Sequence, residues 1–291
     1  MSSRARALTA GLLSIFSVSA FAAAPASPFE AAVSTGSWRA APNNAFASNE
    51  ELSYLISWGI IPGGTSTLAV RGTEIIDGRP AYRLVEEAHS SGLVDTFYHV
   101  RDQNDAWLDV ASLVTLRYEK HIREGKYRVE ETVVLDQIHH RYQDHSYRID
   151  KNVYENKEGA LPPDALDVLS SLYYVRTLPL AAGRSFTFDV YSGGKVWPLA
   201  VKVRKRETIR VPVGQFDCFL IEPLLREPGI FVAKGKKLQV WLTADERRIP
   251  VRMRSEVVIG HVSAELVNFR LIPLSNPQTP SSAGAIPAPK K

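Results

Sequence analysis

The heptapeptide WGIIPGG, from Trp58 to Gly64, separates two segments whose apolar and polar residues alternate. ELSYLIS precedes it and TSTLAV follows it, and each segment has the two-residue period of a β-strand. Pro62 removes one donor from a strand ladder, and two adjacent glycines permit backbone conformations closed to other residues. The heptapeptide therefore predicts a turn or bulge that bends a sheet and gives it a concave side.

Strand-like alternation recurs along most of the chain. The residues predicted to share strand faces are Tyr54, Ile56 and Trp58, then Trp197, Leu199, Val201 and Val203, and finally Ile249, Val251 and Met253. Glycine-containing turn signals separate the strands at Asp77-Gly78, Glu124-Gly125, Gly193-Gly194, Val213-Gly214, Lys234-Gly235 and Ile259-Gly260. This spacing predicts roughly eleven to thirteen strands. A sheet of that size curves strongly, so we expect a mainly β fold in which a curved antiparallel sheet forms a half-open or incomplete β-barrel.

One segment breaks this pattern: residues 161–186, LPPDALDVLSSLYYVRTLPLAAGRSF. Two prolines precede Asp164, which is predicted to cap a helix, and Asp167 follows in the first turn, where a negative charge suits the helix dipole. Apolar residues then recur at helical spacing, and Pro179 and Gly183 end the segment. We expect one inserted amphipathic helix of about three turns that covers the concave side of the sheet.

The N-terminus has the three parts of a secretory signal peptide. Arg4 and Arg6 are followed by an apolar run and by a cleavage sequence of the A-x-A type that ends at Ala22. Residues 1–22 are therefore predicted to be removed on export to the periplasm. The apolar run is shorter than the roughly 20 residues that a membrane span needs, and no other stretch is apolar enough to be one. We expect a mature chain without a transmembrane span.

Cys218 is the single cysteine of the chain. It lies far from the predicted cleavage site, which excludes a lipid anchor on an N-terminal cysteine, so the protein is not expected to be a lipoprotein. A lone cysteine also makes no internal disulfide. In the string QFDCFLI it alternates with Phe216 and Leu220, which predicts a small, buried hydrophobic side chain on one face of a strand.

Composition divides the chain into four parts. After the signal peptide, residues 23–51 are rich in Ala, Ser, Asn and Pro and are predicted to be flexible. Residues 52–272 contain no linker and are predicted to form a single half-barrel domain, and residues 273–291 form a low-complexity tail predicted to be disordered. Loss of Arg4 and Arg6 lowers the net charge from +4 to +2. The basic residues are interspersed with acids, so no nucleic-acid partner is expected.

The order of five strings between Leu52 and Leu271 resembles the bacterial domain-of-unknown-function family 3108. The strings are YLISWGIIPGGTSTLAV, GRPAYRLVEEAHSSGLVDTFYHVRDQNDAWLD, REGKYRVEETVVLD, DALDVLSSLYYVRTLPL and KLQVWLTADERRIPVRMRSEVVIGHVSAEL. The resemblance implies a periplasmic protein of Gram-negative bacteria without an established reaction. It also implies a fold similar to the incomplete β-barrels of lipoprotein-localisation carriers and other envelope lipid-binding proteins. The family supplies no catalytic residues to carry over.

The sequence itself also gives no sign of a catalytic site, since the chain contains no GxSxG, P-loop, HExxH or dinucleotide-binding motif. Two clusters were weighed as sites. His139, His140 and His145 near Asp144 suggest a metal site, but adjacent residues of a strand point to opposite faces, which favours exposed histidines at a hairpin. A second cluster comprises Asp95, His99, Asp102 and Asp105, and it lacks a nucleophile. We therefore predict no catalytic residue, no metal ligand and no cofactor.

The leading hypothesis is a non-enzymatic protein that binds or carries a lipid or other hydrophobic envelope ligand in the half-barrel cavity. The residues predicted to line the cavity are Trp58, Ile60, Ile61, Leu169, Leu172, Tyr173, Trp197 and Trp241. Each of these side chains can also serve simply to fill the core. Two other classes stay open. One is a structural or adaptor protein that binds an envelope protein partner through exposed strand edges or charged turns. The other is an enzyme acting on envelope polysaccharide or lipid, with Asp102 and Asp105 as its candidate carboxylates.

Overall fold

A computed structural model describes residues 38–225, 237–257 and 260–273 of the chain. In this part of the chain one sheet contains β1 (Glu51–Trp58), β2 (Ile61–Ile76), β3 (Arg79–Ser90), β4 (Arg101–Asp109), β5 (Thr115–Glu124), β6 (Tyr127–Asp136), β7 (Arg141–Arg148) and β8 (Val153–Ala160). It continues with β9 (Leu166–Asp167), β10 (Ser185–Ser192), β11 (Lys195–Val211), β12 (Gly214–Leu225), β13 (Leu238–Thr243), β14 (Pro250–Glu256) and β15 (His261–Arg270). The helices are α2 (Gly92–Phe97) and α3 (Val168–Thr177). The predicted signal peptide and most of the predicted tail lie outside the described residues.

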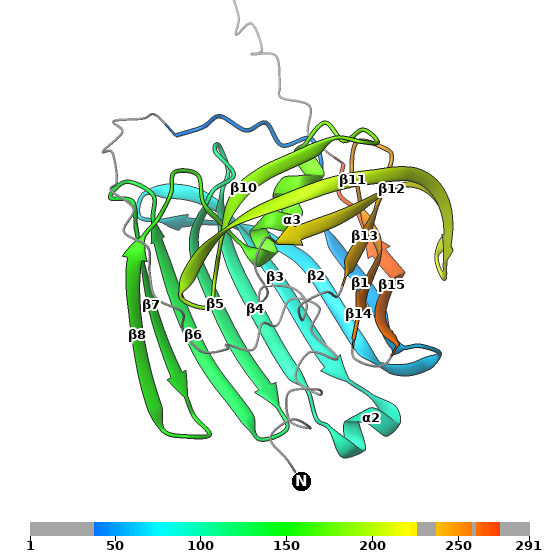
Figure 1. Cartoon of the computed structure of the whole chain (residues 1–291), viewed down its shortest axis with the longest axis horizontal. Coiled ribbons are helices and arrows are strands. Elements are labelled where there is room, and N and C mark those ends of the chain that lie inside the picture. Colours follow the sequence, from blue (N-terminus) through cyan, green and yellow to red (C-terminus); the bar gives the residue numbers. More distant parts are fainter. Residues whose placement is uncertain (1–37, 226–236, 258–259, 274–291) are drawn as a thin grey trace, which may run out of the picture.

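The sheet is curved and does not close, as predicted (Figure 1). Its strand order is β8-β7-β6-β5-β4-β3-β2-β1-β15-β14-β13-β12-β11-β10-β9, so β8 and β9 are its two edges. All pairs are antiparallel except β9 with β10. The described sheet has 15 strands, more than predicted. β8 escapes a pattern search because exposed or half-buried residues occupy both of its faces, and β9 is only two residues long. No helix of the described residues is long and apolar enough to cross a membrane.

The heptapeptide from Trp58 to Gly64 forms the turn between β1 and β2. Gly59 has a positive φ of 57°, and the pairing register shifts between Ile56 and Ser57, where β2 contains one extra residue. The predicted bend is thus a tight turn combined with a β-bulge, which increases the local twist of the sheet. Positive φ was expected at the glycine pair that ends the heptapeptide, but it occurs at Gly59, the residue that reverses the chain.

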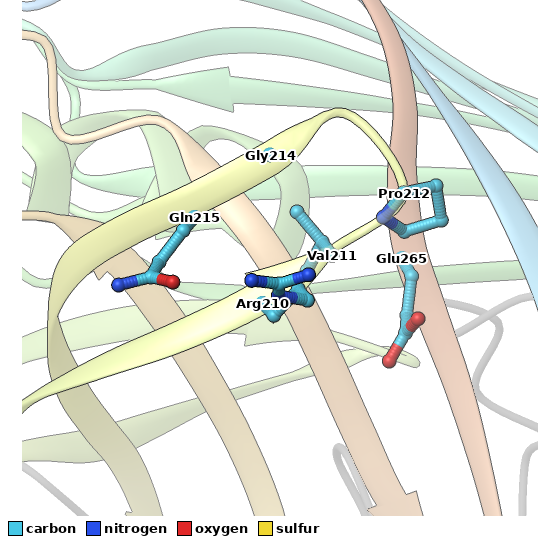
Figure 2. A pocket seen from close by; sticks show the side chains of 6 residues that line it. All are labelled: Arg210, Val211, Pro212, Gly214, Gln215 and Glu265. Atoms are coloured by element: carbon cyan, nitrogen blue, oxygen red, sulfur yellow. The ribbon is translucent and has the colours of Figure 1, made fainter.

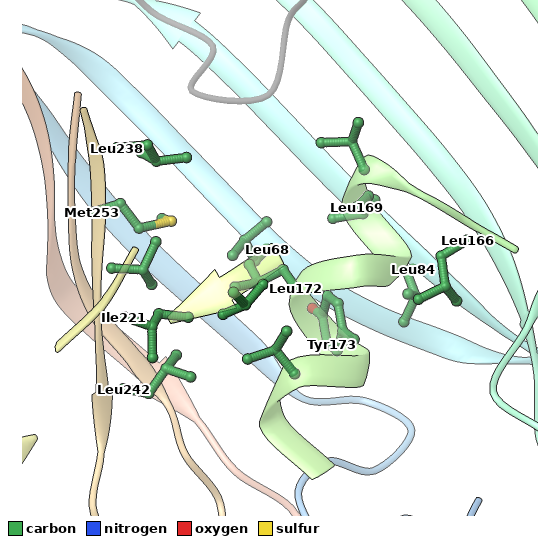
Figure 3. Packing of buried hydrophobic residues seen from close by; sticks show 14 of the residues in the cluster. Leu68, Leu84, Leu166, Leu169, Leu172, Tyr173, Ile221, Leu238, Leu242 and Met253 are labelled. Atoms are coloured by element: carbon green, nitrogen blue, oxygen red, sulfur yellow. The ribbon is translucent and has the colours of Figure 1, made fainter. Parts of the chain in front are cut away.

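α3 packs against the concave face of the sheet. Leu169, Leu172 and Tyr173 are buried among apolar side chains from β2, β3, β12, β13 and β14 (Figure 3). Burial of a Leu, Val or Phe side chain contributes about 1.5–3 kcal/mol, so the helix stabilises the curvature by filling the space that it encloses.

The helix begins three residues later than predicted. Asp167, and not Asp164, is the N-cap: its Oδ1 accepts hydrogen bonds from the backbone N–H groups of Leu169 (2.7 Å) and Ser170 (3.0 Å). Its Oδ2 accepts a hydrogen bond from the hydroxyl of Thr115 (2.7 Å), at the start of β5. One buried carboxyl therefore caps α3 and fixes it to the sheet, and burial raises the pKa of this carboxyl.

A buried ion pair fixes the other end of α3. Arg176 donates from Nη1 to Oε1 of Glu50 at 2.7 Å and from Nη2 to Oε2 at 3.0 Å. The two side chains are 1% and 0% exposed. Arg176 also donates to the backbone oxygens of Ala45 and Arg247, so its guanidinium joins the residues before β1, α3 and the turn before β14.

Residues 38–50, which the sequence places in a flexible segment, pack against the sheet. Phe46 is 1% exposed and makes edge-to-face contacts with Tyr82 and Tyr173. Arg39 donates from Nε to the backbone oxygen of Ser112 at 2.7 Å. The packed domain therefore begins before Leu52. The aromatic and arginine side chains of residues 38–50 contact residues far along the chain, and the local composition does not reveal those contacts.

The two halves of the sheet meet through side chains. The hydroxyl of Tyr142 in β7 donates to the backbone oxygen of Gly194 in the β10–β11 turn at 2.7 Å. The hydroxyl of Tyr191 in β10 donates to Oδ2 of Asp144 in β7 at 2.7 Å. These side-chain contacts join β7 to β10 and its turn, at the place where backbone hydrogen bonds would join two strands in a closed barrel. We call the contacts of Tyr142 and Asp144 with Gly194 and Tyr191 the seam.

Substitution of Arg176 by Met is expected to destabilise the fold by about 3–5 kcal/mol, because it leaves the carboxylate of Glu50 buried without its cation. Chemical denaturation of the mature protein measures this change. The double variant Arg176→Met, Glu50→Met leaves no unpaired charge and should recover part of the loss. The exposed pair of Arg206 and Asp217 provides the control: Arg206→Gln should leave the denaturation midpoint unchanged. Equal midpoints for Arg176→Met and Arg206→Gln would show that the buried pair contributes nothing.

Candidate functional site

The eight residues predicted to line a cavity lie in three different places. Leu169, Leu172 and Tyr173 are core residues of α3. Trp58, at 43% exposed, lies with Ile60 (97%) and Ile61 (49%) at the β1–β2 turn. Figure 1 places this turn at the same end of the molecule as α2.

The two remaining tryptophans are on the β10–β14 half. Trp241 is buried at 6% exposed and belongs to the main core cluster, where its Nε1 donates to Glu207 at 2.9 Å and the guanidinium of Arg252 lies 5.7 Å from its ring. Trp197 is half-buried beside the β10–β11 turn, with Lys195 5.7 Å from its ring. The structure therefore does not gather the eight residues around one pocket, and their role in binding stays a prediction.

A row of polar residues crosses the concave face of the other half. Six residues stand directly opposite one another on consecutive strands from β3 to β8: Glu86, Asn104, Lys120, Glu131, Ser146 and Glu155. We call them the polar row. Their neighbours two positions along each strand include the core residues Leu84, Ala106 and Val133, which shows that the row faces the concave side. A concave face packed only for stability would be apolar here.

Hydrogen bonds and charges link the members of the row. The Asn104 side-chain amide donates to Glu86, and the hydroxyl of Tyr118 donates to Oδ1 of Asn104 at 2.9 Å. Lys120 Nζ lies 3.7 Å from Glu131 Oε2. Glu86 is 1% exposed, and burial raises its pKa to about 7, against the lowering effect of its bond from Asn104. This carboxyl is therefore partly protonated near neutral pH and both donates and accepts hydrogen bonds.

A second pair of carboxyl groups lies between the polar row and the end of the sheet that carries α2. Glu124 is 2% exposed and Asp102 is 1% exposed. Burial raises the pKa of Glu124 to about 9, and the charge of Asp102 adds to the shift. Asp102 Oδ1 accepts a hydrogen bond from the backbone N–H of Arg123 at 2.9 Å. Glu124 is the proton-bearing member of this pair at neutral pH.

Apolar residues flank the polar row on both sides. Toward α3 lies the main core, and toward the α2 end lie Ala88, Ile122 and Val129, which are 0%, 2% and 5% exposed. These three share strand faces with Glu86, Lys120 and Glu131, two positions along each strand. Asp102 lies directly opposite Ala88 on the same face, so the α2 side of the polar row is apolar except for the buried carboxyl groups of Asp102 and Glu124.

The two clusters weighed for catalysis and metal binding are dispersed. Asp102 faces the concave side, whereas Asp105, three residues later, faces the convex side and pairs with Arg83 at 2.8 Å. Asp95, in α2, pairs with Arg101 at 2.8 Å and lies 3.1 Å from His99 Nδ1. The carboxylates proposed for the enzyme class therefore do not meet.

The histidines also separate. His139 lies in the β6–β7 turn, where its Nδ1 is 2.7 Å from Asp136, whereas His145 contacts Asn156 of β8. Asp144 faces the seam instead, where burial raises its pKa to about 6. Cys218 is buried, as predicted, and burial raises its thiol pKa to about 12.

A shallow depression of about 600 Å³ lies beside the β11–β12 turn (Figure 2). It is lined by Arg210, Val211, Pro212, Gly214, Gln215 and Glu265. Glu265 alternates with the core residues Ala264 and Leu266 and pairs with Arg252 at 2.8 Å, which places the depression on the convex side. None of the eight sequence-predicted residues lines it.

The sequence model of a family described as protein of unknown function (DUF3108) matches residues 53–267. The chain belongs to this family. The match covers nearly all of the sheet, including every strand of the polar row, and it confirms the resemblance drawn from the sequence strings. The sequence matches no curated protein.

Three solved structures are similar to this DUF3108 member to different degrees. A β-barrel-like protein of domain of unknown function DUF1849 from Brucella abortus has a TM-score of 0.54 at 11% identity, covering 79% of this chain and 100% of that chain. An exported protein with a YmcC-like fold from Bacteroides fragilis has a TM-score of 0.34 at 6% identity, covering 78% and 97%. A lipoprotein from Parabacteroides distasonis has a TM-score of 0.33 at 8% identity, covering 78% and 97%. The Brucella protein shares the barrel-like fold, and at this identity the likeness extends no further.

The polar row was missed by the sequence analysis, although part of its signal is present. Glu86 is in phase with Leu84 and Ala88, and Asn104 is in phase with Ala106, so both fall on the apolar face of a strand. A period-two reading therefore identifies each residue as an inward polar side chain. Their alignment into one row depends on the pairing register, which the sequence does not reveal.

Stability is expected to fall as pH rises from about 5 to about 9. Glu86 and Glu124 hold protons in the folded chain that they lose in the unfolded chain, because their folded pKa values exceed the ordinary value of 4.5. The contribution of these two carboxyl groups to the free energy of unfolding is complete below their pKa in the unfolded chain. It is lost as the pH rises through their pKa values in the folded chain. For Glu86 alone the change is on the order of 3 kcal/mol.

Urea denaturation at pH 5, 7 and 9 tests this expectation. Glu86→Gln and Glu124→Gln mimic the protonated side chains. Each should reduce the decrease in the free energy of unfolding between pH 5 and pH 9. Glu155→Gln is the matched control and should leave it unchanged, because this side chain keeps its contact with water on folding. A wild-type stability that is constant or rises across this window would contradict the assignment.

Proposed function

We propose that this DUF3108 protein binds an amphipathic molecule of the cell envelope on the concave face of β3–β8. The polar row holds the polar group of the ligand, and the apolar part lies along Ala88, Ile122 and Val129 toward the α2 end. The observation that carries the proposal is the polar row itself: polar side chains on the concave face of six consecutive strands, between the main core and a zone that is apolar except for Asp102 and Glu124.

Energetic cost supports a functional role for these residues. A buried ionised carboxylate loses several kcal/mol of hydration unless it is paired or protonated. Glu86 and Glu124 respond by retaining protons, and Lys120 lies beside Glu131. Perturbed acids gathered in a concavity are typical of binding and catalytic sites, whereas a purely structural sheet would place apolar residues at these positions.

The chemistry of the row indicates the class of polar group. Asn104 and the partly protonated Glu86 donate and accept hydrogen bonds, while Lys120 and Glu131 supply one charge of each sign. This set suits a zwitterionic or hydroxyl-bearing headgroup better than a purely anionic one, because Glu131 and Asp102 would repel additional negative charge. The ligand in this proposal is therefore a lipid with such a headgroup, and the protein has no catalytic role in it.

The compartment in this proposal is the periplasm. Its support is the signal peptide predicted at residues 1–22, and the lone Cys218 argues against an N-terminal lipid anchor. In that compartment an open sheet with an amphipathic concave face is suited to hold a lipid away from water.

An adaptor role is the second candidate, and β8 is the observation that favours it. This strand is a free edge of the described sheet, and its exposed residues include Val153 (42%) and Tyr154 (73%). An incoming strand from a partner protein could pair with it. Glu155, Lys157 and Glu158 on the same strand oppose such pairing, since charged edge residues discourage strand addition.

Ligand binding is tested on protein purified gently from a periplasm. Organic extraction followed by mass spectrometry is expected to yield one lipid per protein, and delipidated protein should bind a fluorescently labelled phosphatidylethanolamine. Ser146→Trp places a bulky ring in the polar row and should weaken binding at least tenfold. His145→Trp, one residue away on the convex face, is the matched control and should bind like the wild type. An empty protein that also fails to bind the labelled lipid would refute the proposal.

A further inference from the structure

Exposed apolar side chains are concentrated at one end of the molecule. At the α2 end, the β1–β2 turn exposes Trp58, Ile60 and Ile61, and α2 exposes Leu93 (69%) and Phe97 (80%). No residue of α2 is buried, so the apolar side of this helix faces solvent. Large apolar side chains gathered in this way mark an interaction surface.

The β1–β2 turn and α2 form one continuous surface. The backbone N–H of Ser91 donates to the oxygen of Gly63 at 3.0 Å, and the Val94 side chain lies against Gly63. The β5–β6 turn adjoins α2, because Gly125 donates to the oxygen of His99 at 2.8 Å. We call this end of the sheet, with the β7–β8 turn beyond it, the α2 rim (Figure 1).

The charge at the tips of the α2 rim is positive. Lys126 in the β5–β6 turn and Lys151 in the β7–β8 turn are exposed. Of the acids near these two turns, Asp95 pairs with Arg101 at 2.8 Å and Asp150 pairs with Arg148 at 2.9 Å. Glu256 is exposed farther along the rim, beside the β1–β2 turn. The rim therefore combines exposed apolar side chains with two lysines whose charge the neighbouring acids do not neutralise.

The opposite rim differs. Its exposed large apolar residues include Ile75 (67%) at the β2–β3 turn, Ile138 (66%) at the β6–β7 turn and Phe269 (41%) near the end of β15, on separate strands. Single exposed apolar residues of this kind are normal on a protein surface. The clustering of exposed apolar side chains at the α2 rim is therefore not a feature that the turns at both ends share.

From this asymmetry we infer that the α2 rim docks on the surface of an anionic phospholipid bilayer. Ile60, Leu93 and Phe97 insert into the interface between headgroups and acyl chains, and Trp58 lies at headgroup level, where tryptophan is favoured. Lys126 and Lys151 bind the anionic headgroups. A bilayer fits better than a protein partner, because the apolar side chains project from separate turns and a short helix and line no groove.

This docking goes beyond the proposed function, since it rests only on exposed side chains and requires no ligand on the concave face. The two are geometrically compatible. The apolar zone of Ala88, Ile122 and Val129 lies between the polar row and the α2 rim, so a docked protein would direct the open end of its concave face at the bilayer.

Vesicle cosedimentation with delipidated protein tests the inference. The probe is a vesicle of phosphatidylethanolamine and phosphatidylglycerol. The wild type is expected to bind, and Ile60→Ser combined with Phe97→Ser should lower the partition coefficient at least tenfold. Ile75→Ser combined with Ile138→Ser, the same change at the opposite rim, should leave it unaltered. These exposed positions make no core contacts, so all four substitutions should preserve the denaturation midpoint.

The charge contribution is tested separately. Lys126→Glu combined with Lys151→Glu should weaken binding to these vesicles, and omission of phosphatidylglycerol should weaken binding of the wild type. The inference is overturned if the wild type does not bind the vesicles, if both pairs of serine variants bind equally, or if the rim variants instead lose a protein partner. Vesicle binding by protein that fails the labelled-lipid test would support docking while refuting the proposed ligand.

Discussion

The buried ion pair of Arg176 and Glu50 constrains the rest of the structure. A guanidinium that is 1% exposed needs its charge matched and its donors satisfied, and Glu50 with two backbone oxygens does both. Arg176 belongs to α3, and its partners come from the residues before β1 and from the turn before β14. The ion pair therefore sets the position of the helix within the curved sheet. The aliphatic packing of α3 then completes a core whose position the ion pair has fixed.

The helix divides the concave face into unlike regions. Where α3 packs, the face is apolar and filled by side chains from both halves of the sheet. Beyond the helix, β3–β8 extend toward the α2 rim, no second sheet of the described residues covers them, and the polar row lies there. A single helix of ten residues thus separates a stabilising core from a region in which Glu86 is partly protonated and Glu124 protonated at neutral pH.

Local features of the sequence predicted much of this fold. The alternation around Trp58–Gly64 predicted a bend, residues 161–186 predicted the helix, and Cys218 was correctly expected to be buried, because each depends on neighbours within a few residues. The cap at Asp167 was misplaced to Asp164, since either aspartate suits a helix start and only the contact with Thr115 decides between them. The partnership of Arg176 with Glu50 spans 126 positions and has no local signal. The polar row likewise depends on register across six strands, so composition and period alone predicted a site of aromatic and aliphatic residues instead.

The position of β1 in the sheet has a consequence for how the chain acquires its fold. β1 pairs with β2 on one side and with β15 on the other, so Glu51 lies opposite Arg270. The hairpins from β2 to β8 are sequential and form from local contacts, whereas the second neighbour of β1 is β15, the last described strand in chain order. Until β15 pairs with it, β1 keeps one open edge that carries Leu52, Tyr54 and Ile56, an aggregation-prone surface. Loss of the C-terminal strand would make that exposure permanent, and we therefore expect the last described strand to tolerate truncation least.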